Sequence, residues 1–101
     1  MQKNFRTYQL AITFYRQVGN IKLSGHLKEQ LRRAAASIVL NLAEGSGRTT
    51  ALDRVKFYNI AFGSLRECQA VLDLAGPQGA AAGACADSLA AHIYRLITNT
   101  K

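Results

Sequence analysis

Apolar residues recur at helical spacing through most of the chain and divide it into four predicted helices. The longest pattern covers Ser24 to Gly45, where an apolar face emerges when residues are placed at 100° per position. Similar patterns predict helices at about Asn4 to Val18, at about Ala51 to Ala75, and from about Ala84 onward. No segment shows the alternation that is typical of β-strands. The chain is therefore expected to be all-α, as an antiparallel up-down-up-down four-helix bundle.

Glycine, proline and capping residues set the predicted boundaries of these helices. Ser24 is a predicted N-cap, Gly45 is the predicted C′ residue of the second helix, and Pro77 follows the end of the third. The alanine and glycine stretch from Gln78 to Ala86 carries no clear structural expectation. A length of 101 residues is typical of one domain, so residues 1–101 are expected to form a single bundle.

A row of polar residues lies beside the apolar face of the central helix. An unpaired buried polar group costs about 1–3 kcal/mol, so these side chains are expected to form a hydrogen-bonded seam with the third helix. Counting outward from the turn near residue 48 predicts an ion pair between Arg33 and Glu67. Gly63 in the third helix predicts the close approach of another backbone, because a glycine within a helix costs about 1 kcal/mol. The predicted seam comprises Arg33, Ser37, Asn41, Glu44, Ser64 and Glu67.

The first two helices carry apolar residues on more than their core faces. A helix surface that faces solvent is normally charged, so a second apolar face indicates contact with another chain. Aromatic residues are enriched in the centres of such interfaces. These faces predict a homo-oligomer, whose expected contact residues are Phe5, Tyr8, Ile12, Tyr15 and Leu40.

Basic residues outnumber acidic ones, with 13 Lys and Arg against 6 Asp and Glu and a net charge of +7. This balance favours a polyanionic partner such as nucleic acid, although a basic surface that merely keeps a protein soluble is the alternative. Arg54 is expected to extend along the core face near the start of its helix. The candidate phosphate contacts are Arg6, Arg16, Lys28, Arg32, Arg48, Lys56, Arg66 and Arg95.

The sequence offers little for catalysis or metal binding. Cys68 and Cys85 are too few and wrongly spaced for a zinc site with His26 and His92, so no metal and no cofactor is expected. Cys68 lies on the core face of its helix and is interpreted as a small buried apolar residue. No nucleophile, base and carboxylate occur at a motif spacing, which argues against an enzyme. No apolar run approaches the ~20 residues of a membrane span, and no signal peptide is evident, so a cytoplasmic location is expected.

Several motifs in the two central helices carry a family resemblance. They are QLRRA at residues 30–34, SIVLNLAEGSGR at residues 37–48, GSL at residues 63–65, and Glu67-Cys68. These motifs resemble the four-helix bundle family first noticed as open reading frames within intervening sequences of bacterial 23S ribosomal RNA genes. The resemblance covers nearly half the chain. It implies a homopentamer with a central channel, and a distant relationship to accessory subunits of diversity-generating retroelements, which bind nucleic acid and a reverse transcriptase.

The signature positions of that family coincide with the predicted seam and two glycines. One position departs, because the family commonly has a basic residue just before the Gly-Ser pair and this chain has Phe62. Helical periodicity places Phe62 at the edge of the core. The signature positions correspond here to Arg33, Ser37, Asn41, Glu44, Gly45, Gly63, Ser64 and Glu67.

Two functions remain open at this point. The first is a non-enzymatic homo-oligomer that binds nucleic acid, with RNA favoured, through phosphate contacts repeated around a ring. The second is a protein-interaction scaffold or accessory subunit with no direct nucleic-acid role, for which a reverse transcriptase is a partner by distant analogy. Phosphate binding weakens steeply with salt, whereas an apolar protein contact does not, so a salt titration separates the two.

Overall fold

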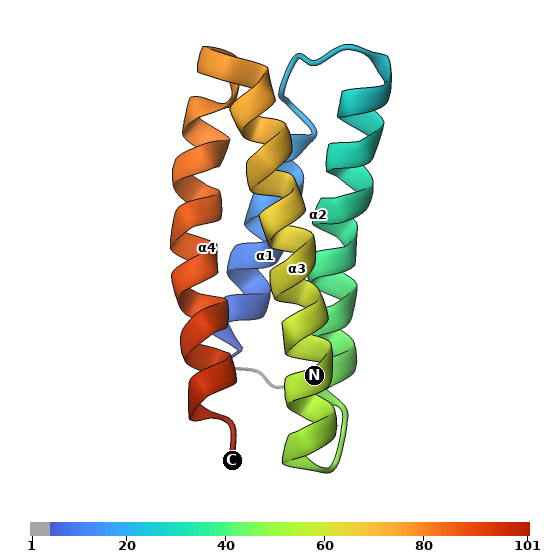
Figure 1. The fold of residues 1–101 in the computed structure, drawn as a ribbon, viewed down its shortest axis with the longest axis vertical. Helices are drawn as coiled ribbons and strands as arrows, with labels where there is room; N and C mark the ends of the chain where they lie inside the picture. The colour runs from blue at the N-terminus through green and yellow to red at the C-terminus, as the bar shows by residue number, and fades with distance from the viewer. Residues whose placement is uncertain (1–4) are drawn as a thin grey trace.

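The computed structural model of the protein describes residues 5–101, which fold into α-helices joined by short connections (Figure 1). No strand occurs among these residues. The all-α class predicted from the sequence is therefore confirmed. The helices are α1 (Arg6–Val18), α2 (Gly25–Ser46), α3 (Ala51–Ala75) and α4 (Ala80–Asn99), with the short 3-10 helix η1 (Gly76–Gly79) between α3 and α4.

The helices lie side by side along the long axis of the molecule, and each runs antiparallel to the one before it (Figure 1). α2 packs against both α1 and α3, and α4 packs against both α3 and α1, so the helices enclose one core. The molecule measures 40 × 21 × 21 Å. The 25 residues of α3 span about 37 Å at 1.5 Å per residue, so this helix alone accounts for nearly the full length.

The core is built from the faces that the periodicity predicts. In α2 the buried apolar side chains are Leu31, the adjacent Ala34 and Ala35, Ile38 and Leu42, which recur every three or four residues along one helical face. Phe62 is partly buried against this core, in agreement with its predicted place at the edge. The largest fully buried side chains are Phe14, Val18, Leu31, Ile38, Leu42, Leu65, Cys68, Leu89 and Ile93.

The end of α2 differs from the prediction. The sequence predicts Gly45 as the residue that closes the helix, but α2 continues to Ser46 and Gly47 is the C-cap. Gly45 is buried, and a Cβ atom built on it would lie 2.6 Å from Cε1 of Tyr58 and 3.2 Å from the carbonyl oxygen of Arg54. Glycine is therefore needed here for the close approach of α3 to α2, and not for a left-handed turn.

Two other boundaries are shifted from their predicted positions. α1 begins at Arg6, and the predicted start at Asn4 lies outside the described residues. α4 begins at Ala80 rather than at about Ala84, because the alanines that precede residue 84 favour helix despite Gly83. Between α3 and α4, Gly76 adopts a φ of 68°, which ends α3, and Pro77 follows it within the turn of η1.

The close approach at Gly45 makes a prediction about stability. Gly45→Ala should lower the free energy of unfolding by about 1–3 kcal/mol, because the added methyl group must displace the Tyr58 ring or the α3 backbone. Gly83→Ala is the matched control in α4, where no atom lies within 4 Å of the added Cβ. It should raise stability by up to about 1 kcal/mol through helix propensity. Urea denaturation measures both changes, and equal effects of the same sign would contradict this account of Gly45.

Candidate functional site

A polar groove of about 640 Å³ runs between α2 and α3. Most of its lining side chains are polar or charged, which is unusual for a groove next to a core. Four residues of the predicted seam meet in it, so the structure brings these positions from two helices together. The lining residues are His26, Glu29, Gln30, Arg33, Ala34, Ser37, Ser64 and Glu67.

A hydrogen bond between half-buried side chains joins α2 to α3 in this groove. Oγ of Ser37 lies 2.8 Å from Oγ of Ser64, across the two helices. Nδ2 of Asn41 donates to Oγ of Ser37 at 3.1 Å and to the carbonyl oxygen of Ser37 at 2.9 Å. Within the predicted seam, the Ser37 and Ser64 hydroxyls therefore link the two helices directly, and Asn41 supports Ser37 from within α2.

The predicted ion pair between Arg33 and Glu67 is wrong. Nε2 of Gln30 donates to Oε2 of Glu67 at 3.2 Å, and no ion pair within residues 5–101 involves Arg33. Gln30 and Arg33 lie one turn apart on α2, and Gln30 is the one that reaches Glu67. Because Arg33 and Glu67 are both exposed, water solvates their charges and an ion pair between them would contribute little.

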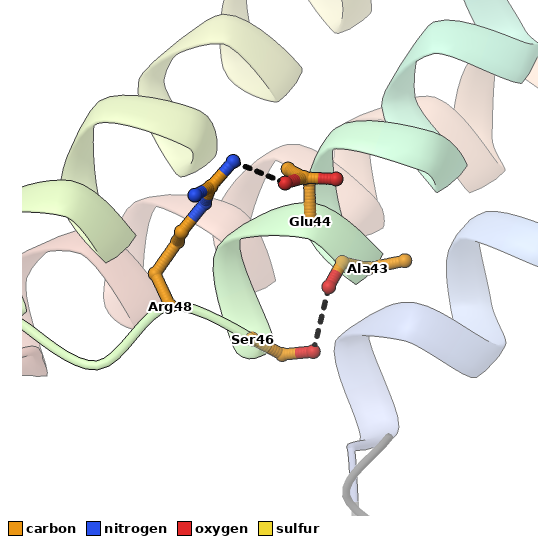
Figure 2. A network of polar contacts seen from close by, with 4 residues as sticks. All are labelled: Ala43, Glu44, Ser46 and Arg48. Atoms are coloured by element: carbon orange, nitrogen blue, oxygen red, sulfur yellow. Dashed lines mark hydrogen bonds and ion pairs between the residues drawn. The ribbon is translucent and has the colours of Figure 1, made fainter.

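Glu44 also lies outside the link between α2 and α3. Its carboxylate accepts a hydrogen bond from the guanidinium of Arg48, which follows one turn later (Figure 2). Figure 2 also shows the Ser46 hydroxyl, which donates to the carbonyl oxygen of Ala43 at 3.0 Å. The side chains of Arg48 and Glu44 are 43% and 50% exposed, so this pair sits at the surface. The seam predicted as buried is thus buried only in part.

A second groove, which we call the apolar groove, lies between α1 and α2. Its volume is about 210 Å³, and it is lined by Ile12, Tyr15, Ala36, Val39 and Leu40. Leu40 is 67% exposed and Tyr15 is 37% exposed. Three of the five predicted oligomer contacts therefore share one continuous apolar surface.

The other two predicted oligomer contacts serve the core of the chain itself. Phe5 is only 7% exposed, and its ring centroid lies 6.3 Å from that of Tyr58 in α3. Tyr8 is half-buried and stacks on Phe5 with the centroids 6.0 Å apart. The prediction is wrong for Phe5, because Tyr58 approaches it from another helix and covers it.

Seven of the eight candidate phosphate contacts are exposed, and Lys28 differs from the others. Its ammonium donates to the carbonyl oxygens of Gly19, at 3.2 Å, and Ile21, just beyond the C-terminal end of α1. Lys28 thus fastens the connection between α1 and α2, as cations near helix C-termini often do. The exposed cations are Arg6, Arg16, Arg32, Arg48, Lys56, Arg66 and Arg95.

Three of the exposed cations lie over aromatic rings of α3. The guanidinium carbon of Arg48 is 4.8 Å from the ring centroid of Phe57, and Nζ of Lys56 is 5.9 Å from the same centroid. The guanidinium carbon of Arg66 is 4.6 Å from the ring centroid of Phe62. Sequence reasoning missed these contacts, although the four-residue spacing of Phe62 and Arg66 on a helix was a usable signal.

Arg54 has a structural role at the same end of the molecule. Its guanidinium donates to the carbonyl oxygens of Arg48, at 3.2 Å, and Thr49, at 3.1 Å, and to that of Lys101 at 3.5 Å. Arg54 therefore ties the turn between α2 and α3 to the end of the chain, instead of only lying along the core face.

The two cysteine thiols are the titratable groups of interest next to the core. Burial raises the pKa of the Cys68 thiol to about 12, with the nearby Glu67 charge adding to the effect, and burial also raises the pKa of Cys85. Both thiols are thereby held in the protonated form, which is a poor nucleophile. Within residues 5–101, no three His, Cys, Asp or Glu side chains are grouped as a metal site requires. None of the described helices combines the length and apolar character needed to cross a membrane.

Comparison with known proteins agrees with this architecture. The sequence matches the family described as 23S rRNA-intervening sequence protein over residues 3–100. The fold resembles the crystal structure of a protein of unknown function from the S23 ribosomal protein family of Bacteroides thetaiotaomicron. The TM-score is 0.81 at 16% identity, covering 90% of this chain and 97% of that chain. No curated protein shows significant sequence similarity to this chain.

The raised pKa of Cys68 predicts how slowly this thiol is alkylated. With a pKa of about 12, only about one Cys68 side chain in ten thousand is a thiolate at about pH 8. In a Cys85→Ala variant, iodoacetamide should label the folded protein far more slowly than the urea-unfolded protein, as mass spectrometry measures. Equal labelling rates in the two states would contradict the burial of Cys68.

Proposed function

The chain belongs to the 23S rRNA-intervening sequence protein family, and we propose that it is a non-enzymatic, basic homo-oligomer that binds nucleic acid, with RNA favoured. The observation that carries this proposal is the set of seven exposed candidate cations on a molecule of net charge +7. Phosphate groups are the natural partners of such a surface, and their binding needs no deep pocket. In this proposal the protein acts in the cytoplasm, where ribosomal RNA is available.

The distribution of the cations supports weak contacts at several places instead of one strong site. Arg6, Arg16 and Arg95 lie on α1 and α4, whereas Arg48, Lys56 and Arg66 lie on α3 or beside it. A single chain could place only a few of them on one strand of nucleic acid. A ring of copies repeats each contact, and the high effective concentration of linked sites then raises the overall affinity.

Self-assembly is the second part of the proposal, and the apolar groove supports it. Leu40 lines this groove and is 67% exposed. A second copy packed on the groove would remove this apolar surface from water. Gly63 adds a further indication, because no atom lies within 4 Å of a Cβ built on it, so nothing within the described chain explains a glycine there. A ring-shaped assembly of four-helix bundles fits these surfaces, and the family resemblance favours a pentamer.

The alternative function is a protein-interaction scaffold or accessory subunit. The polar groove between α2 and α3 favours it, because exposed Arg33 and Glu67 offer both charge signs to a partner. By distant analogy that partner would be a reverse transcriptase. Such binding would depend on paired charges and shape, not on a surplus of positive charge.

Salt dependence tests the nucleic-acid proposal. A labelled single-stranded RNA should bind at about 50 mM salt and lose about ten-fold in affinity at about 200 mM, which corresponds to two or three phosphate contacts. Fluorescence anisotropy measures both affinities. Failure of both RNA and DNA to bind even at low salt would contradict the nucleic-acid proposal and favour the scaffold function.

The oligomeric state tests the assembly proposal. In native mass spectrometry the wild-type protein should appear as a multiple of 11.0 kDa, and five copies are expected. Leu40→Asp should dissociate the assembly, because it places a charge in the apolar groove. Leu74→Asp is the matched control, since Leu74 is 71% exposed but lies outside that groove, and it should leave the assembly intact. A wild-type protein that is monomeric in this measurement would contradict the assembly proposal.

A further inference from the structure

One end of the molecule combines positive charge with exposed apolar surface. At the turn between α2 and α3, the cations of Arg48 and Lys56 lie over the ring of Phe57. Leu52, in the first turn of α3, is 82% exposed. We refer to Arg48, Leu52, Lys56 and Phe57 as the turn-end patch. Exposed cations are common on this protein, but only here, within the described residues, do two of them share one ring.

Arg48 is held in place before any partner arrives. Its backbone carbonyl accepts a hydrogen bond from Arg54, and its guanidinium donates to Glu44 at the end of α2 (Figure 2). An exposed arginine normally loses much side-chain freedom when it binds a ligand. The contact with Glu44 already restricts part of this freedom in Arg48, so a ligand that uses its guanidinium loses less side-chain entropy on binding.

We propose that the turn-end patch binds an unpaired nucleotide of a single-stranded nucleic acid. The base stacks on the Arg48 guanidinium and the accessible part of Phe57, and the neighbouring phosphates lie against Arg48 and Lys56. This inference rests on the proposed nucleic-acid function and adds to it a preference for single strands over duplexes.

The chemistry of the turn-end patch favours single-stranded nucleic acid over duplexes. Cations alone attract the phosphates of any nucleic acid, single-stranded or duplex. An aromatic ring and a guanidinium plane are stacking surfaces, and only unpaired bases have free faces to place on them. Leu52 precedes Lys56 by one turn of α3 and is exposed, so it adds apolar surface next to that cation.

Glu44 gives the proposal a distinctive test, because its carboxylate orients Arg48 but also repels phosphate. Glu44→Gln keeps the size of the side chain and removes the negative charge. If Arg48 binds phosphate, this variant should bind single-stranded RNA several-fold more tightly. A purely structural role of the Glu44 and Arg48 pair predicts no gain, and the half-exposed pair contributes little to folding in either case.

The binding experiment uses the full chain with two labelled probes, an oligouridine and an RNA duplex of the same length. The wild-type protein should prefer oligouridine. Phe57→Leu keeps an apolar side chain and removes the ring, so it should weaken oligouridine binding about five-fold or more while changing duplex binding little. Circular dichroism confirms that each variant is folded.

Arg48→Ala and Arg16→Ala form a pair matched in charge. Both remove one exposed arginine, but Arg16 lies in the last turn of α1, outside the turn-end patch. Arg48→Ala should reduce the salt dependence of oligouridine binding by about one phosphate contact and weaken the preference over duplex. Arg16→Ala should leave that preference unchanged.

The outcomes distinguish the two levels of the proposal. Failure of both probes to bind at low salt overturns the proposed function and this inference together. Equal binding of the two probes, or a Phe57→Leu variant that retains the full preference, overturns the inference alone and leaves electrostatic nucleic-acid binding in place. If Glu44→Gln binds single-stranded RNA no more tightly than the wild type does, Arg48 does not contact phosphate and the inference is likewise overturned.

Discussion

The packing of α2 against α3 determines where the polar groove and the turn-end patch lie on the surface of this protein. Gly45 lets the ring of Tyr58 approach the α2 backbone near one end of the helix pair, and the Ser37 and Ser64 hydroxyls join the helices further along. Two contacts at different heights fix both the separation and the register of the two longest helices. The same register places Arg48 over Phe57 and leaves Arg33 and Glu67 facing one groove. A shift of α3 by one residue would change each of these arrangements.

The apolar groove proposed for assembly and the turn-end patch proposed for an unpaired nucleotide are formed by different sets of residues. The apolar groove belongs to α1 and α2, whereas the turn-end patch lies at the turn between α2 and α3. A chain with a net charge of +7 repels its own copies, and apolar contact is the interaction best suited to overcome that repulsion. In the proposed assembly, the separation of apolar surface from charge would therefore let copies associate without covering the cations of the patch.

Periodicity predicted the helices and their core faces well, because both follow from residues a few positions apart. It failed where a second helix decides the outcome. Gly45 was mistaken for a helix end because the sequence does not reveal the Tyr58 ring beside it. The prediction of Phe5 as an oligomer contact is wrong because the sequence does not reveal that Tyr58, far along the chain, packs against it. The Arg33 and Glu67 ion pair failed because counting residues locates the turn of a helix, but not which side chain on that turn reaches across.

The pairing of Arg48 with Glu44 links the proposed nucleic-acid binding to the proposed assembly. Its guanidinium already donates to Glu44, so a phosphate group must compete with a carboxylate for it. Under this proposal one such patch would bind weakly, so a single chain would not hold a polyanion firmly. Several copies in one assembly would present several patches to the same strand, and their joint affinity would grow with each contact that the strand can reach. In this arrangement, binding depends on assembly, because only a strand long enough to span several patches is held firmly.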